Sequence, residues 1–106
     1  MGAPFKVSVG STPIRIVDYS KSRTVVMIYN NSNNTIYIGI GKGLSVQNGF
    51  PVYGYQGMVI AREFGDDPTL SYYAICESGT ADVRVWEGHG ETLGFLIKTL
   101  LEVMRR

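Results

Sequence analysis

The sequence predicts an all-β protein, a small antiparallel β-sandwich or barrel of about seven strands with one C-terminal α-helix. Short apolar segments are separated by turn residues, and no helical periodicity lies between them. After Gly88 the pattern changes, because large apolar residues then recur at helical spacing. We therefore expect a β domain over residues 1–88 and an amphipathic helix over residues 89–106.

The strongest strand signal lies in residues 23–40. Residues 23–29 are almost all apolar or β-branched, which is typical of a central strand covered on both faces. Residues 35–40 alternate isoleucine with tyrosine and glycine, the period of a half-buried strand. The Asn- and Ser-rich residues 30–34 between them favour a turn. We expect these two strands to form a hairpin.

Further strands are expected at Phe5–Val9, Ile14–Val17, 52–55 and 58–64. Residues 70–77 and 81–87 flank a Ser-Gly-Thr turn, so we expect a second hairpin there. The expected core includes Val25, Met27, Ile36, Ile38, Ile75, Val83 and Val85.

The expected helix carries its large apolar residues on one stripe. These residues are Leu93, Leu96, Ile97, Leu100, Leu101 and Met104. Glu91 at the start and arginines at the end match the helix dipole. Two placements stay open: the helix packs across its own sandwich, or, with the glycines at 88, 90 and 94 acting as a hinge, against a neighbouring subunit.

The composition limits which classes of partner are expected. The formal net charge is +1 and the basic residues are scattered, so we expect no nucleic-acid partner, which would need a concentrated basic face. No apolar stretch reaches the length of a membrane span, and we expect no membrane partner. The single cysteine, Cys76, lies in an apolar segment and is expected to be a buried thiol.

No motif predicts catalysis. Residues 39–43 are rich in glycine but lack the phosphate-loop pattern, and they fit a strand exit instead. His89 is the only histidine, which leaves no familiar spacing for a His-based metal site or a Ser–His relay. Asp66, Asp67 and Pro68 form a turn sequence without the calcium-loop pattern. We expect a protein that is not an enzyme, with no catalytic, metal-binding or cofactor-binding residue.

Aromatic residues supply the remaining candidates. Tyrosines and the single tryptophan are expected to line one open face of the sandwich: Tyr53, Tyr55, Tyr72, Tyr73 and Trp86. Three interpretations stay open. The side chains pack against one another across strands, form a protein interface, or stack on a sugar ring.

An ordered set of segments spans residues 23–87: YNNS, TIYIGIG, NGFPV, LSYYAIC and SGTADVRVWE. As a set they resemble the small β-sandwich structural proteins of tailed-phage and prophage virions. The resemblance implies a head decoration or cement protein, or a tail or connector component, and it carries no catalytic residue to this chain.

On this resemblance the expected partners are further copies of the chain, as a trimer or ring, and other virion proteins such as a major capsid protein. The expected location is the virion, after synthesis in the host cytoplasm. The alternative function is a carbohydrate- or receptor-binding module that uses the tyrosine-rich face.

Overall fold

The computed structural model describes residues 4–89, which form eight strands and one short 3-10 turn, η1. The all-β expectation is confirmed for these residues. The elements are β1 (Phe5–Val9), β2 (Ile14–Val17), β3 (Arg23–Asn30), β4 (Ile36–Gly39), β5 (Phe50–Val52), β6 (Gly57–Ala61), η1 (Arg62–Phe64), β7 (Tyr72–Cys76) and β8 (Ala81–His89). The expected helix and its six interface candidates lie outside the described residues.

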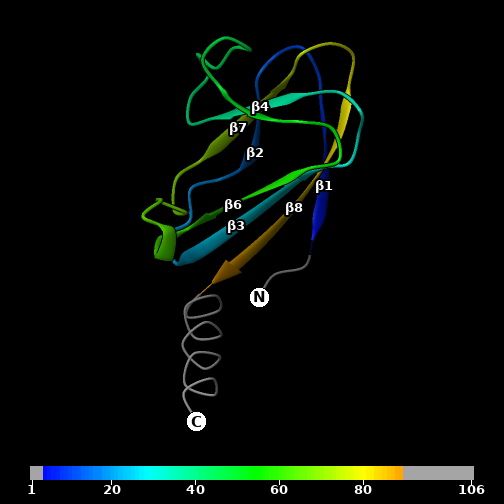
Figure 1. The fold of residues 1–106 in the computed structure, drawn as a ribbon. Helices are drawn as coiled ribbons and strands as arrows, with labels where there is room; N and C mark the ends of the chain where they lie inside the picture. The colour runs from blue at the N-terminus through cyan, green and yellow to red at the C-terminus, as the bar shows by residue number, and fades with distance from the viewer. Residues whose placement is uncertain (1–3, 90–106) are drawn as a thin grey trace.

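The strands form two four-stranded antiparallel sheets that face each other (Figure 1). Sheet A has the order β1-β8-β3-β6, and sheet B has the order β2-β7-β4-β5. Strand β1 pairs with β8, β2 with β7, β3 with β6 and β4 with β5, so the chain doubles back on itself as one long ribbon. Two facing sheets with this nested order form a jelly-roll β-sandwich.

Both expected hairpins are wrong, although the turns lie where the sequence places them. Strands β3 and β4 belong to different sheets, and so do β7 and β8. The side chain of Asn30 is fully buried and donates to the carbonyls of Asn34 and Val52 at 2.6 and 3.0 Å, which holds the crossing between the sheets. Asn34 in turn donates to the Thr80 carbonyl at 2.9 Å, so the two crossing turns contact each other.

The core lies between the sheets and confirms part of the expected set. Ile36, Ile38, Val83 and Val85 are buried within the main apolar cluster. Met27 is only half-buried, and its assignment to the core is wrong.

The reason is the composition of β3, which is apolar at every position from Val25 to Ile28. Periodicity therefore cannot choose the inward face, and in the structure Val26 and Ile28 point inward. Val25 and Ile75 are also buried, but their side chains point to the outer faces of the sheets, so they lie outside the main apolar cluster.

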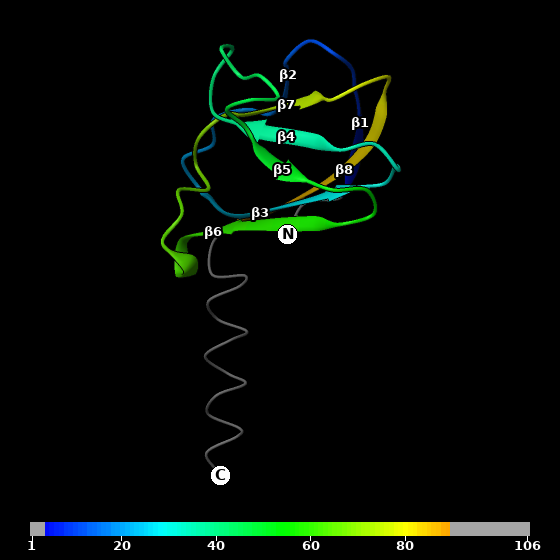
Figure 2. The ribbon, with the colours of Figure 1, turned by 45° about the horizontal axis from the view of Figure 1, so that its top comes forward.

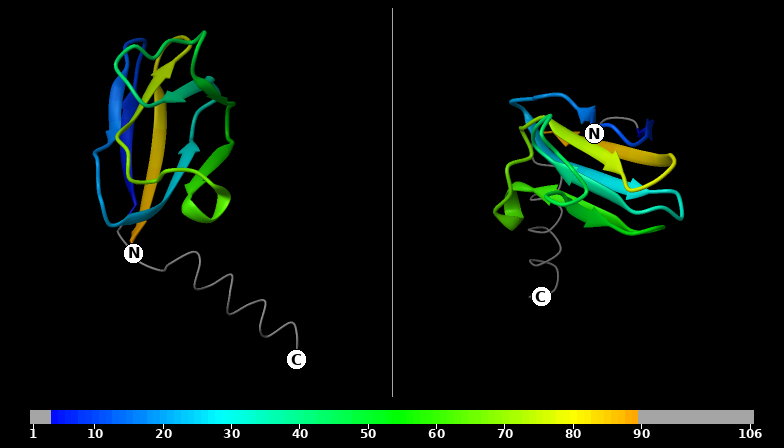
Figure 3. Two further views of the ribbon diagram at one scale, coloured as in Figure 1. Left: turned by 90° about the vertical axis from the view of Figure 1, so that its left-hand side faces the viewer. Right: turned by 90° about the horizontal axis from the view of Figure 1, so that it is seen from above.

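The first and last described strands lie side by side, which the views in Figure 3 show along β1 and β8. Strand β8 continues to His89, which pairs with Arg23, so the strand includes the first residue assigned to the C-terminal segment. The Cys76 thiol is buried, as the sequence predicts.

Candidate interaction surface

The outer face of sheet A, turned away from sheet B, carries a row of large apolar side chains. The register sets Met27 between Trp86 on β8 and Val59 on β6. Tyr29 follows two residues along β3 on the same face. Trp86 and Tyr29 on the two inner strands and Val59 on the edge strand β6 are 37%, 41% and 40% exposed, so together they form an exposed apolar patch.

These side chains line a groove of about 360 Å³, which we call the sheet-A groove. Its lining on the outer face comprises Pro4, Met27, Tyr29, Gly57, Val59, Arg84 and Trp86. A side chain at Gly57 would be tight, because its Cβ would lie 3.0 Å from the carbonyl oxygen of Ile28.

Among the described residues that line the sheet-A groove, Arg84 is the only charged one, and it is already paired. The Arg84 guanidinium donates to the Asp82 carboxylate at 2.7 and 3.0 Å, and Asn31 donates to the same carboxylate at 3.1 Å. These bonds, with Arg84 first, lower the pKa of Asp82 to about 2. The sheet-A groove is therefore an apolar surface, and the charge of Arg84 at its rim is neutralised by Asp82.

The outer face of sheet B is different, because the loop between β4 and β5 covers part of it. Figure 2 shows this loop, residues 40–49, on the side of sheet B away from sheet A. Leu44 from the loop is only 8% exposed. A Cβ at Gly39 or at Gly49 would lie 2.7 Å from the Leu44 Cδ1, so both glycines make room for this side chain.

Tyrosines border the covered part of sheet B. The register places Tyr37 beside Ile75 and Pro51, with Tyr73 diagonally across from it. Desolvation raises the pKa of the Tyr37 phenol, and the neighbouring Glu77 raises it further. This border is a mixed surface of aromatic rings, hydroxyls and one carboxylate.

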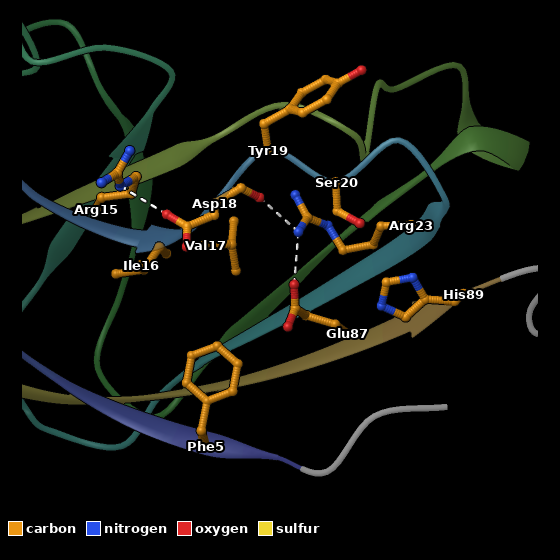
Figure 4. Close-up of a pocket in the computed structure, with 10 residues that line it drawn as sticks. All are labelled: Phe5, Arg15, Ile16, Val17, Asp18, Tyr19, Ser20, Arg23, Glu87 and His89. Carbon is orange, nitrogen blue, oxygen red and sulfur yellow. Dashed lines mark hydrogen bonds and ion pairs between the residues drawn. The ribbon is translucent and has the colours of Figure 1, made fainter.

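A buried arginine holds one end of the sandwich together (Figure 4). Arg23 is 1% exposed. Its guanidinium donates to the carbonyls of Pro68, Leu70 and Asp18 at 2.7, 2.7 and 2.8 Å, and it pairs with the Glu87 carboxylate at 2.6 Å. These bonds join β3 to β8 and to the loops that lead from β2 and toward β7. The Arg23 guanidinium is therefore bonded to groups within the fold, on all three of its nitrogens.

The expected aromatic face does not exist as one surface. Trp86 lies on the outer face of sheet A, whereas Tyr73 lies on the outer face of sheet B. Tyr72 is 8% exposed, points into the core and donates its hydroxyl to the Asp67 carbonyl. Tyr53 and Tyr55 are exposed in the loop between β5 and β6. Three of the residues lie on strands of the two sheets and two lie in a loop, so one face cannot hold all five.

Sequence reasoning named Trp86 but missed its neighbours in the sheet-A groove. The sequence pattern predicts Met27 in the core, and no motif marks Tyr29 or Val59. The available signal was that β3 is apolar at both alternations, which leaves apolar side chains for an outer face as well as for the core.

Within residues 4–89, no group of three or more His, Cys, Asp or Glu side chains is placed to hold a metal ion. The part of the chain that the structure describes also contains no helix long and apolar enough to cross a membrane. Comparison with protein-family models, with curated proteins and with solved structures finds no match for this chain.

Proposed function

We propose that this protein is a non-enzymatic structural component of a virus particle, a head decoration or cement protein or another assembly component, that acts by protein–protein contact. The observation that carries the proposal is the sheet-A groove. Its occupant is an apolar segment of a neighbouring virion protein, such as a major capsid protein.

The chemistry of the groove supports a protein partner. Trp86, Tyr29 and Met27 are residue types that protein interfaces favour. A sugar needs polar groups around its hydroxyls, and here the guanidinium of Arg84 is already engaged by Asp82. An apolar side chain needs no such partner and is stabilised by leaving water.

The order of the strands supports the proposed role in a virus particle. Nested jelly rolls are the architecture of many viral capsid domains, and also of lectins and cupins. This support is an analogy between folds, and a fold alone does not fix a function. It agrees with the resemblance of the chain's segments to virion structural proteins.

The test uses particles of the virus or prophage that encodes the chain. Mass spectrometry of purified particles is expected to find the protein at a fixed ratio to the major capsid protein. Recombinant protein is expected to bind particles from which it has been deleted. Trp86→Ser is expected to weaken that binding by ~10-fold or more, as loss of a central aromatic anchor does.

The matched control is Tyr53→Ser, which removes an exposed aromatic side chain away from the sheet-A groove. This variant is expected to bind particles as the unchanged protein does. Absence of the protein from purified particles, or equal binding by Trp86→Ser, would contradict the proposal.

One observation favours the second candidate, a carbohydrate-binding module. The border of sheet B brings Tyr37 close to Tyr53 and Glu77, so rings and a hydrogen-bonding carboxylate occur together. On this interpretation, glycans added to labelled protein shift the NMR signals of Tyr37 and Tyr53 and leave Trp86 unchanged. Shifts confined to Trp86 would remove this candidate.

A further inference from the structure

The four edge strands of the sandwich differ in how they discourage pairing with another chain. Sheets commonly protect their edges with a charged residue, a proline, a bulge or a short strand. Strand β1 carries the exposed Lys6, and β2 carries Arg15 beside an irregularity in its register. Strand β5 has three residues, one of which is Pro51.

Strand β6 has none of these features. Its sequence, GMVIA, contains no charge and no proline, and its ladder with β3 runs from Gly57 to Ala61 without a register shift. Val59 in its centre is 40% exposed. Among the described edge strands, β6 is thus the one that lacks these devices over Gly57–Ile60, while at its end the outward Ala61 carbonyl accepts the Asp66 amide at 3.2 Å.

The hydrogen-bond alternation shows which backbone groups of β6 face outward. The backbone N–H of Asn30 donates to the Gln56 carbonyl at 2.9 Å, so the backbone groups of even-numbered residues of β3 bond toward β6. The Asn31 amide donates to the Asp82 carbonyl at 2.8 Å, which agrees, because odd-numbered residues then bond toward β8.

In an antiparallel ladder each residue directs both of its backbone groups to the same side. Met58 and Ile60, which are opposite even-numbered residues of β3, therefore bond to β3. Gly57 and Val59 are opposite odd-numbered residues and direct their N–H and C=O groups away from the sheet.

We propose that the β6 edge pairs with the β6 edge of a second copy of this chain, which joins two A sheets across a twofold axis. Antiparallel pairing centred on Val59 lets the two Val59 residues exchange both N–H···O bonds. Gly57 then lies opposite the partner's Ala61, whose carbonyl already accepts the Asp66 amide of its own chain, so the bonds exchanged at Val59 carry the pairing. Each strand presents the same surface to the other, as a twofold interface requires.

The side chains fit this register. Val59 meets the partner's Val59 on the outer face, and Met58 meets the partner's Ile60 on the other face. Neither strand carries a charge between Gly57 and Ala61, and Arg62 begins η1 beyond the ladder, so no like charges face each other in it. The same register brings the two sheet-A grooves onto one continuous outer surface.

This inference does not depend on the proposed virion function, since it concerns the edge of sheet A and needs no other protein. Sedimentation of the full chain is expected to show a dimer that dissociates on dilution. A monomer at the highest attainable concentration would overturn the proposal.

Amide hydrogen exchange tests the backbone directly and needs no mutation. The Val59 amide is expected to exchange at least ~10-fold more slowly in the dimer than in the diluted monomer, whereas Met58 stays protected in both, because its bond lies within sheet A. Equal exchange of the Val59 amide in dimer and monomer would place the interface elsewhere.

Variants test the same edge. Val59→Lys adds a charge at the centre of the edge, and Val59→Pro removes the outward N–H donor. Both are expected to be folded by circular dichroism and monomeric by sedimentation. Should Val59→Pro fail to fold, Val59→Lys and the exchange measurement still decide.

The matched control is Ser8→Lys, which places a charge on β1, the opposite edge of sheet A. It is expected to remain dimeric, as is Trp86→Ser, which alters only the sheet-A groove. A dimer that survives both Val59 variants, or that is lost equally in Ser8→Lys, would overturn the proposal.

Discussion

Sheet A and sheet B both carry apolar side chains on their outer faces, but in the described residues only sheet B covers them with its own loop. Leu44 lies over Gly39 and Gly49 on sheet B and is 8% exposed. On sheet A, Tyr29 and Val59 stay about two-fifths exposed. The difference separates an outer face used for stability from one available for contact, and substitutions on each face are expected to act on different properties.

The largest expected effect disturbs the end of the sandwich that anchors both sheets. Arg23→Ala leaves the Glu87 carboxylate and three backbone carbonyls without their buried donor. The free energy of unfolding is expected to fall by ~3–5 kcal/mol, as loss of one member of a buried ion pair does. Denaturant titration measures it.

Arg15→Ala is the control for Arg23→Ala. Its ion pair with Asp18 is exposed, so its loss is expected to cost under ~1 kcal/mol. Equal costs for the two variants would mean that the Arg23 bonds contribute no more than a surface pair.

The next effect separates the two outer faces. Leu44→Ala is expected to cost ~2–3 kcal/mol, because it removes a buried side chain that sheet B leaves room for. Val59→Ala on sheet A is expected to cost under ~1 kcal/mol, since that side chain is already partly in water. Thermal and denaturant unfolding of both variants give the comparison. A larger loss for Val59→Ala would reverse the roles assigned to the faces.

The smallest effect concerns the rim of the sheet-A groove and depends on pH. The folded pKa of Asp82, about 2, lies below the usual value near 4. Its contribution to stability is therefore complete above pH ~4 and is lost as pH falls toward ~2. Asp82→Asn is expected to lose less stability than the unchanged protein across that interval in denaturant titrations. Parallel curves for the two proteins would contradict this assignment.

Local sequence predicted most strands and turns, because strand period and turn residues act over neighbouring residues. The expected strand at 52–55 is wrong, since β5 is Phe50–Val52, and residues 62–64 of the expected strand 58–64 form η1. The bounds of β1 and β2 match the expected Phe5–Val9 and Ile14–Val17. Pairing was not predictable in the same way. The buried side-chain amide of Asn30 donates to the backbone carbonyl of Val52, 22 residues away. Nothing in the Asn-rich turn itself distinguishes a hairpin from a crossing between the two sheets.

The candidate surface was only partly visible for a related reason. Trp86 stands out by residue type, but Met27 looks like a core residue until the register shows which side of β3 faces sheet B. Likewise, Gly39 makes room for Leu44, a contact that the glycine-rich sequence of residues 39–43 does not indicate. The sequence shows which side chains are apolar. Which surface each of them covers depends on how the strands pair in the fold.

The position of β8 has a consequence for how the protein is made. Although it is the last of the described strands in the chain, it lies in the interior of sheet A, between β1 and β3. During translation, β1 has no neighbour in its sheet until residues 81–89 have left the ribosome. We therefore expect sheet A to form late, through contacts distant in sequence, and folding to be slow compared with a helical protein of this size.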